Sequence, residues 1–501
     1  LQGCPWDWKT SALAAKEGHI HVLVWAQANG GEWSESTCAH AALGGQLEAL
    51  QYVRSHGCPW NAATCALAAE NGHLDVLKWA REQNCPWDAD TCSLAASRGN
   101  LVLLQWAHSN GCPWDENTCA KAAGGGHMAV LKWLREQQCP WNKWTVANAA
   151  LGGHLDVLKW ARGAEQQEPC PWNEQTCAEA AAGGHLTLLQ WAHEQACPWS
   201  TETCGEAAAG GHLTMLQWVR LQGCPWDEYT CAGAALGGHL ETLKWARLQG
   251  CPWDWKTSAL AAKEGHIHVL VWAQANGGEW SESTCAHAAL GGQLEALQYV
   301  RSHGCPWNAA TCALAAENGH LDVLKWAREQ NCPWDADTCS LAASRGNLVL
   351  LQWAHSNGCP WDENTCAKAA GGGHMAVLKW LREQQCPWNK WTVANAALGG
   401  HLDVLKWARG AEQQEPCPWN EQTCAEAAAG GHLTLLQWAH EQACPWSTET
   451  CGEAAAGGHL TMLQWVRLQG CPWDEYTCAG AALGGHLETL KWARLQGCPW
   501  D

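Results

Sequence analysis

Cysteine is the residue type whose number and spacing point most directly to chemistry in this chain. The 501 residues include 31 Cys and 24 His. Cys recurs at two positions, before Pro-Trp as at Cys58 and after Thr as at Cys65. Thiols at this density can form disulfides, bind zinc, or pack as small apolar side chains. Their spacing and their exceptions favour the first of these alternatives and leave the third open.

The spacing does not favour a metal or an active site. Six residues separate Cys58 from Cys65, which is wider than the spacing in compact zinc sites. The His of a recurrent Gly-His pair is replaced by Gln46 and Asn100 in two repeats, so we interpret these His as turn or helix-capping residues. A catalytic site should be an exception within an array, and no repeat has a nucleophile, a base and a carboxylate that its neighbours lack. We therefore expect no metal, no cofactor and no enzyme activity.

The exceptions distinguish two ways of pairing the cysteines. Pairing within one Cys-Pro-Trp…Thr-Cys stretch leaves three mismatched partners in each period of the sequence. Pairing across a repeat, as Cys65 with Cys85, means that Ser11 and Gly31 are lost together and that Val146 alone faces an unmatched cysteine. Two antiparallel helices of similar length also return the chain to its starting level, which brings the wider pair together. We therefore predict the wider pairing.

The predicted pairs recur 247 residues further on, and three cysteines remain unpaired. The disulfide candidates are Cys38–Cys58, Cys65–Cys85, Cys92–Cys112, Cys119–Cys139, Cys177–Cys197, Cys204–Cys224 and Cys231–Cys251. The unpaired candidates are Cys4, Cys170 and Cys417. Formed disulfides would favour an extracellular location, whereas free thiols packed as small apolar side chains would favour the cytoplasm.

The cysteines are positioned by a repeat of 27 residues, which is most regular from Asn61 to Trp87. Each repeat has Asp, Asn or Ser directly after the Trp, and these side chains accept hydrogen bonds at a helix N-terminus. An Ala-rich run then ends at a recurrent Gly such as Gly72, as a left-handed helix stop requires. A second run has apolar residues at helical spacing and ends before Pro86. Each repeat is therefore predicted to be a helix, a tight turn and a second helix.

The repeats form a longer period that defines the domains. Nine repeats, one of which carries a four-residue insertion, make 247 residues, and the sequence then recurs without change. We assign residues 1–247 and 248–494 to two identical super-repeats and residues 495–501 to the start of a third. Because helices this short are unstable alone, the repeats must stack on their neighbours. The fold class is therefore all-α, a solenoid of helix-turn-helix repeats.

Two series of Trp follow the same period and are predicted to pack one repeat on the next. The inter-repeat packing candidates are Trp6, Trp33, Trp60, Trp79, Trp87, Trp106, Trp114 and Trp133. An aromatic surface for stacking sugars or bases is the alternative for these series. Trp8 and Trp144 fall outside both series and are better candidates for a surface contact.

The segment AAxxGHLxxLKWA, from Ala68 to Ala80, resembles the second half of an ankyrin repeat. The whole unit, CPWDxxTCxxAAxxGHLxxLKWA, resembles the short ankyrin-like arrays of algae and large DNA viruses. The unit is shorter than an ankyrin repeat, and Thr-Cys stands where ankyrin has Thr-Pro-Leu-His. The resemblance implies an ankyrin-like solenoid that lacks the β-hairpin finger and binds protein through its curved face.

The charge and composition of the chain limit the kinds of partner that it is expected to bind. The formal net charge of −19 argues against nucleic acid and anionic membranes, and no apolar run is long enough for a membrane helix. Two hypotheses of function remain. The first is a structural rod or filament, cross-linked by disulfides, that associates with itself head to tail. The alternative is a scaffold that binds another protein.

Overall fold

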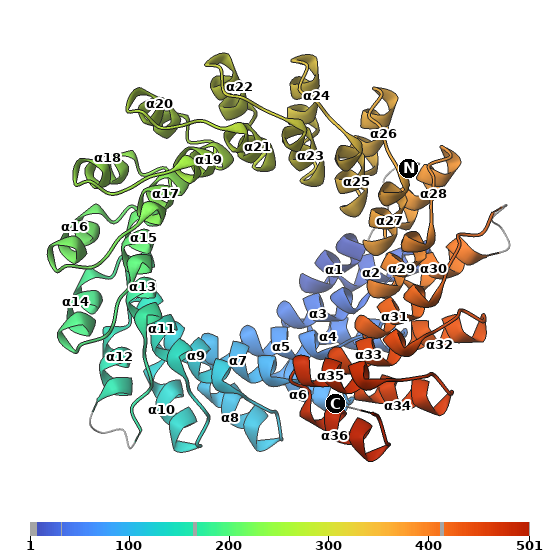
Figure 1. Ribbon diagram of the computed structural model, residues 1–501. Coiled ribbons are helices and arrows are strands. Elements are labelled where there is room, and N and C mark those ends of the chain that lie inside the picture. The colour runs from blue at the N-terminus through green and yellow to red at the C-terminus, as the bar shows by residue number, and fades with distance from the viewer. Residues whose placement is uncertain (1–7, 32, 164–167, 411–414, 500–501) are drawn as a thin grey trace. The chain divides into compact units, whose positions relative to one another are not determined.

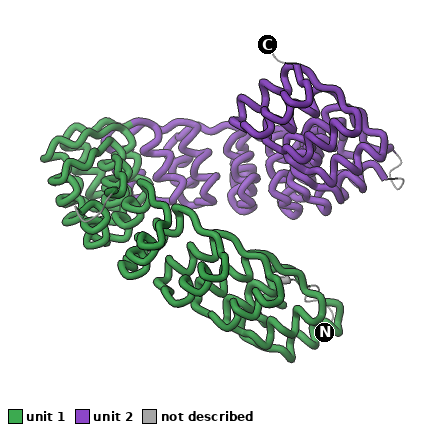
Figure 2. The backbone as a smooth tube through the Cα atoms, turned by 90° about the horizontal axis from the view of Figure 1, so that it is seen from below, with its two compact units in different colours: residues 1–253 green, residues 254–501 purple. Residues whose placement is uncertain are grey.

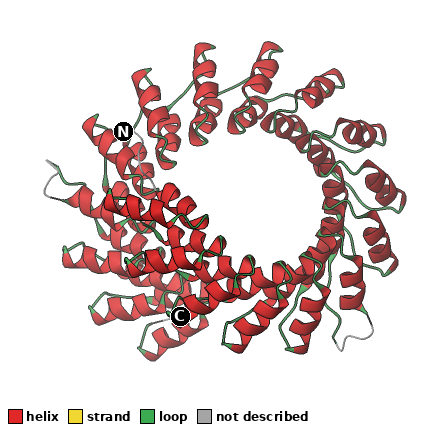
Figure 3. Cartoon of the chain, turned by 180° about the vertical axis from the view of Figure 1, so that it is seen from behind, coloured by secondary structure: helices red, strands yellow, loops and turns green. Residues whose placement is uncertain are grey.

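The computed structural model describes residues 8–31, 33–163, 168–410 and 415–499, so Cys4 and Trp6 lie outside the described residues. Within these ranges the chain forms 36 helices and no strand (Figures 1 and 3). The fold is an all-α solenoid of helix-turn-helix repeats without a β-hairpin finger, and the predicted fold class is confirmed. Every helix in the described ranges falls short of the length and apolar character that a bilayer crossing demands.

The first nine repeats supply eighteen helices, two to a repeat. They are α1 (Trp8–Lys16), α2 (Ile20–Ala28), α3 (Glu35–Leu43), α4 (Leu47–Ser55), α5 (Ala62–Glu70), α6 (Leu74–Glu82), α7 (Ala89–Ser97), α8 (Leu101–Ser109), α9 (Glu116–Gly124), α10 (Met128–Glu136), α11 (Lys143–Leu151), α12 (Leu155–Arg162), α13 (Glu174–Ala182), α14 (Leu186–Glu194), α15 (Thr201–Ala209), α16 (Leu213–Leu221), α17 (Glu228–Leu236) and α18 (Leu240–Leu248). The remaining helices, from α19 (Trp255–Lys263) to α36 (Leu487–Leu495), have the same bounds shifted by one period.

The odd-numbered helices begin where the capping pattern predicts. The side chain of Asn61 precedes α5 in extended backbone and accepts a hydrogen bond from the Ala63 N–H at 3.1 Å. Asn142 caps α11 in the same way, and Thr145 completes a capping box with it. Loss of such a cap typically destabilises a helix by about 1 kcal/mol. An Asp, Asn or Ser after the Trp therefore caps most odd-numbered helices, whereas Asn173 precedes α13 without a capping hydrogen bond from its side chain.

Each repeat contains two turns. Among the described residues both turns end a helix with a residue in the left-handed region, except after α12 and its copy α30, where Gly163 and Gly410 have φ −69° and −66°. In the intra-repeat turn after α13, Gly184 has φ +75°, and the His185 N–H donates to the Ala180 carbonyl at 3.0 Å. In the inter-repeat turn after α16, Gly223 has φ +85°, and the Cys224 N–H donates to the Val219 carbonyl at 2.9 Å. Both are Schellman endings, which satisfy the last carbonyls of a helix.

Two layers of helices result, an inner layer of odd-numbered helices and an outer layer of even-numbered ones (Figure 1). Consecutive inner helices pack closely on each other, whereas outer helices contact mainly the inner helix of their own repeat. The inner helices can approach because their buried positions hold small side chains such as Ala66, Ala68 and Ala69. Larger buried side chains such as Leu77 fill the space between the two layers.

The chain divides into two compact units, Leu1–Trp253 and Asp254–Asp501 (Figure 2). Each unit contains nine helix pairs within the described residues, and the contacts of one recur in the other because their sequences are the same. The assignment of domains at residues 247 and 494 stays a prediction from the sequence period.

Candidate recognition surface

The cysteines of each predicted pair lie side by side as free thiols. The thiols of Cys38, Cys119 and Cys231 lie 4.0, 3.9 and 4.0 Å from the backbone carbonyls of their predicted partners Cys58, Cys139 and Cys251. The 30 described cysteines are all buried and unbonded. Disulfide formation therefore stays a prediction, and the structure shows the thiols that would form it. Among the described residues, no group of three or more His, Cys, Asp or Glu side chains is arranged to hold a metal ion.

As thiols, the cysteines close each repeat on itself. The Cys58 thiol, which follows α4, donates to the Ser34 carbonyl at the start of α3 at 3.3 Å. The hydrogen bond to Cys58 and then burial raise the pKa of the paired Cys38 thiol. Burial also raises the pKa of the unpaired Cys170 to about 12, and its thiol donates to the Asn142 carbonyl at 3.2 Å. The Cys38 and Cys170 thiols are therefore protonated at pH 7 and poor nucleophiles, whereas the hydrogen bond from Cys38 lowers the pKa of the Cys58 thiol.

The Trp residues predicted to pack repeats together lie at the contacts between consecutive repeats. The rings of Trp60 and Trp79 meet edge to face with their centroids 6.0 Å apart. Trp87 meets Trp106 at 6.1 Å, Trp114 meets Trp133 at 5.8 Å, and Trp33 meets Tyr52 at 6.1 Å. These edge-to-face contacts stabilise the stack.

A cation from the outer layer extends this aromatic series. The Arg54 guanidinium lies 4.0 Å from the centre of the Trp60 ring, and it also donates to the Cys58 carbonyl. In the repeat that has His108 at this position, the imidazole stacks on Trp114 at 3.7 Å instead. Each such Trp is therefore covered on one face and met edge-on by the next repeat, which leaves little of it for a sugar or a base.

The recurrent His residues bridge repeats rather than cap their own helices. His212 precedes α16 without a capping hydrogen bond from its side chain. Its Nε2 lies 3.3 Å from the Ala182 carbonyl at the end of α13, one repeat earlier. His127 reaches the Ser97 carbonyl in the same way at 3.0 Å. Because a carbonyl only accepts, Nε2 must carry the proton. Each of these His residues stands in the intra-repeat turn, at the N-cap position of the following helix, as one of the two predicted roles requires, but the side chain contacts the preceding repeat instead of capping its own helix.

Exposed side chains of the inner layer differ from repeat to repeat. The second residue of α11 is Trp144, 42% exposed, and the second residue of α17 is Tyr229, 56% exposed. In the other seven repeats this position holds Lys9, Ser36, Ala63, Asp90, Asn117, Gln175 and Glu202. The following residue is Thr in all nine. Trp144 thus lies on the surface, as its position outside both Trp series predicts, and the side chain of Trp8 lies outside the described residues.

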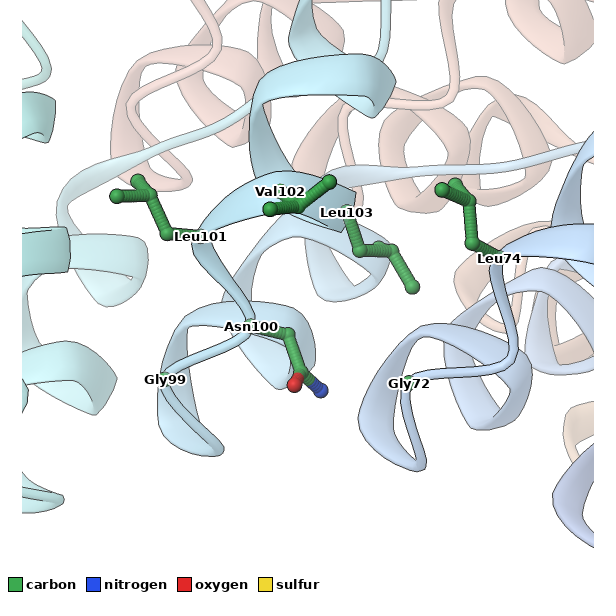
Figure 4. A pocket seen from close by; sticks show the side chains of 7 residues that line it. All are labelled: Gly72, Leu74, Gly99, Asn100, Leu101, Val102 and Leu103. Atoms are coloured by element: carbon green, nitrogen blue, oxygen red, sulfur yellow. The ribbon is translucent and has the colours of Figure 1, made fainter.

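Two grooves flank one turn of the first compact unit, from Ser97 to Asn100. The turn notch, about 360 Å³, is lined by Gly72, Leu74, Asn100, Leu101 and Val102 among others (Figure 4). The inner groove, about 480 Å³, lies on the other side of the turn and is lined by Leu94, Arg98, Lys121 and Leu151 among others. The sequence analysis missed these residues, although several of them depart from the repeat, which is the signal that could have found them.

Charge is unevenly distributed along the inner layer. The inner helices α13, α15 and α17 carry Glu but no Lys or Arg. Burial, and then the neighbouring Glu179, raise the pKa of Glu206 on α15. Arg98 and Lys121 therefore lie in a part of the inner layer that differs electrostatically from the part formed by these three helices.

No family model and no curated protein matches this chain. Similar solved structures include the maize pentatricopeptide repeat protein PPR10, at TM-score 0.29 and 13% identity over 98% of this chain and 93% of that one. PPR10 in complex with an 18-nt psaJ RNA element matches at TM-score 0.30 and 12% identity over 98% and 90%. The human ASB11 ankyrin repeat domain matches at TM-score 0.27 and 17% identity over 31% and 84%.

Proposed function

We propose that this chain is a recognition scaffold whose inner helix layer binds another protein. One observation carries the proposal: the contacts that join repeats recur along the array with few substitutions, whereas the exposed positions of the inner helices differ from repeat to repeat. Stacking alone would place no demand on these positions. The resemblance to short ankyrin-like arrays belongs to this proposal, and the proposed role is binding rather than catalysis.

The exposed inner side chains are of the types that dominate protein interfaces. Trp, Tyr and Arg are enriched among the residues that contribute most to binding. Trp144 and Tyr229 project from the first turns of α11 and α17, where the packed inner layer holds their backbone in place. Trp144 also has the Lys143 ammonium 5.3 Å from its ring centre. A rigid backbone that presents such side chains favours affinity, because little conformational freedom is lost on binding.

Peptide-display selection on the full chain tests this function. We expect selected peptides to bind wild type and to lose about tenfold in affinity when Trp144 and its copy Trp391 are changed to Ala. The matched control changes Leu221 and Leu468, exposed on the outer layer, to Ser and should leave binding unchanged. Peptides that respond to the outer-layer control alone, or retention of single-stranded RNA in place of any peptide, would contradict the proposal.

The second candidate is a stiff rod or filament that associates with itself head to tail. The specific observation that favours it is that cysteines of the predicted pairs lie next to each other, as where the Cys38 and Cys231 thiols lie 4.0 Å from the carbonyls of Cys58 and Cys251. Oxidation would cross-link such repeats, and an extracellular location would follow. If they form, fourteen disulfides leave three of the 31 Cys titratable in denaturant without reductant. A count of 31 would sink the cross-linked rod. Sedimentation that does not change with concentration would count equally against self-association.

A further inference from the structure

One turn of the array departs from the repeat at three nearby positions. Arg98 stands where six of the nine repeats have Gly, and Asn100 stands where seven have His. Val102 stands where the other repeats have a polar residue or Ala, and it is 71% exposed. A stack needs none of these changes, and each alters the surface rather than the core.

Asn100 opens the turn notch by being shorter than His. A Cβ atom on Gly184 would lie 2.6 Å from the His212 ring, whereas one on Gly72 would lie 3.3 Å from the Asn100 amide. The Asn100 amide still donates to the Ala69 carbonyl at 3.4 Å. The contact between repeats is therefore kept, while the shorter side chain leaves room in the turn notch beside Leu74 and Val102 (Figure 4).

The inner groove on the other side of the turn combines cations with apolar walls. Arg98 is 61% exposed and pairs with Glu70 at 2.8 Å, and Lys121 is exposed in the same groove. An ion pair this exposed contributes little to stability, so Glu70 can give way to another carboxylate. Leu94 and Leu151 supply the apolar walls, and Leu151 is 45% exposed.

We infer that the turn Ser97–Asn100, with its two grooves, binds an extended segment of another protein. In this segment carboxylate side chains alternate with apolar side chains. The inference rests on the recognition function proposed above. The carboxylates pair with Arg98 and Lys121, the only cationic side chains lining the inner groove. The apolar side chains lie against Leu94 and Leu151 and enter the turn notch beside Val102. The charge complementarity is local, because the chain as a whole is acidic.

The period of the sequence supplies this site twice. Arg345 pairs with Glu317 at 3.0 Å in the second compact unit, and the Asn347 amide donates to the Ala316 carbonyl at 3.3 Å. Val349 is exposed to the same extent as Val102. One chain therefore carries two equivalent sites, and each compact unit binds one segment.

Binding of a defined peptide to the full chain tests the site and its number. The probe is a fluorescein-labelled peptide, Ser-Leu-Glu-Leu-Ser-Leu-Glu-Leu-Ser, and its partner has Lys in place of both Glu. We expect the acidic peptide to bind at two per chain and the basic peptide to bind about tenfold more weakly. Arg98→Glu should reduce the number bound to one, and Arg98→Glu combined with Arg345→Glu should reduce it to none.

Matched variants separate the site from general effects of charge and folding. Lys244→Glu with Lys491→Glu reverses the same charge on the outer layer, at residues that pair with Glu241 and Glu488, and should leave two sites. Arg98→Gln with Arg345→Gln removes the cation without adding a like charge beside Glu70 and should weaken binding less than the Glu variants do. Asn100→His with Asn347→His fills the notch and should weaken binding while both cations stay.

Several outcomes would overturn the inference. Equal binding of the basic peptide, a stoichiometry that stays at two in Arg98→Glu, or no binding of the acidic peptide to wild type would each do so. Loss of the peptide on Trp144→Ala with Trp391→Ala, but not on the Arg98 and Arg345 changes, would leave the recognition scaffold standing and place its site elsewhere on the inner layer. Loss on the Lys244 and Lys491 control alone would contradict both.

Discussion

The intra-repeat turn and the inter-repeat turn have the same backbone conformation, but different residues pack against them. Both end a helix with the same pair of hydrogen bonds and a residue at positive φ. The intra-repeat turn has Gly in all nine repeats, as at Gly184. The inter-repeat turn has Gly in five repeats of the first compact unit, as at Gly223, but Asn84, Gln138 and Ala196 in three others, with φ between 58° and 61° in those three. The same conformation thus tolerates side chains in one turn and not in the other.

What surrounds the turns explains the difference. The His of the next repeat lies against most intra-repeat Gly residues, with Gln or Asn in its place at some and nothing within 4 Å at Gly485, and a Cβ on Gly184 would lie 2.6 Å from the His212 ring. Nothing lies within 4 Å of a Cβ on Gly223. Glycine is therefore required twice over in the intra-repeat turn, for its conformation and for the room it leaves. In the inter-repeat turn it is favoured for conformation alone.

The largest effect is expected for Gly184→Ala, which tests both requirements at once. A non-glycine residue at this φ costs roughly 1–2 kcal/mol, and the overlap with the His212 ring adds about 1–3 kcal/mol. An array this long does not unfold in one step, so the free energy of local opening is measured from hydrogen exchange in α13 and α14.

His212→Ala in the Gly184→Ala background is the control. It removes the ring that the new methyl group meets, so the cost of Gly184→Ala should fall to that of the conformation alone. An unchanged cost in the double variant would show that the ring is not the obstacle.

His212→Ala alone is expected to have the second largest effect and to lower the free energy of local opening by about 1–2 kcal/mol. It removes the donor to the Ala182 carbonyl, which ends α13 and has no partner within its own helix. Faster hydrogen exchange in both α13 and α16 is the expected readout, because the ring joins two repeats. His212→Asn should recover part of the loss, since Asn100 keeps such a contact with Ala69 of the preceding repeat. Exchange that changes in α16 alone would contradict the bridging role.

Features that depend on the residues of a single repeat can be predicted from the sequence. Contacts between two neighbouring repeats require the structure. Asn61 and Gly72 mark helix ends by their residue types, and the paired loss of Ser11 and Gly31 predicts which cysteines meet. Spacing does not set whether two neighbouring thiols are bonded. The bridge from His212 to Ala182 depends on how two repeats lie against each other. Local residue patterns carry no such information.

The same reasoning explains the missed site. Arg98, Asn100 and Val102 can be recognised in the sequence as departures from the repeat, but their types do not tell whether they are exposed. From the sequence alone, the two repeats could equally have moved together to fill the space that the shorter Asn100 side chain leaves. Its shorter side chain opens a notch because the Gly72 turn keeps its place, which the fold of two adjacent repeats decides.

Gly223→Ala should have a smaller effect than Gly184→Ala in an otherwise equivalent backbone. The φ of +85° costs an Ala side chain about 1 kcal/mol, and no neighbour meets the added methyl group. Hydrogen exchange in α15 and α16, under the same conditions as for Gly184→Ala, measures this loss of local stability. Equal costs for the two variants would mean that backbone conformation alone explains the glycine pattern and that the His contact adds nothing.

Ala196→Gly should have the smallest effect and the opposite sign. Ala196 holds φ at 58°, and its N–H donates to the His193 carbonyl at 2.9 Å, which any residue can do. Removing its Cβ relieves the left-handed strain, while the greater freedom of Gly in the unfolded chain offsets part of the gain. We therefore expect local stabilisation of up to about 1 kcal/mol in α14, seen as slower hydrogen exchange. A destabilised α14 would show that the Ala196 methyl group makes a contact that outweighs its strain, and the inter-repeat turn would then resemble the intra-repeat turn in being shaped by packing.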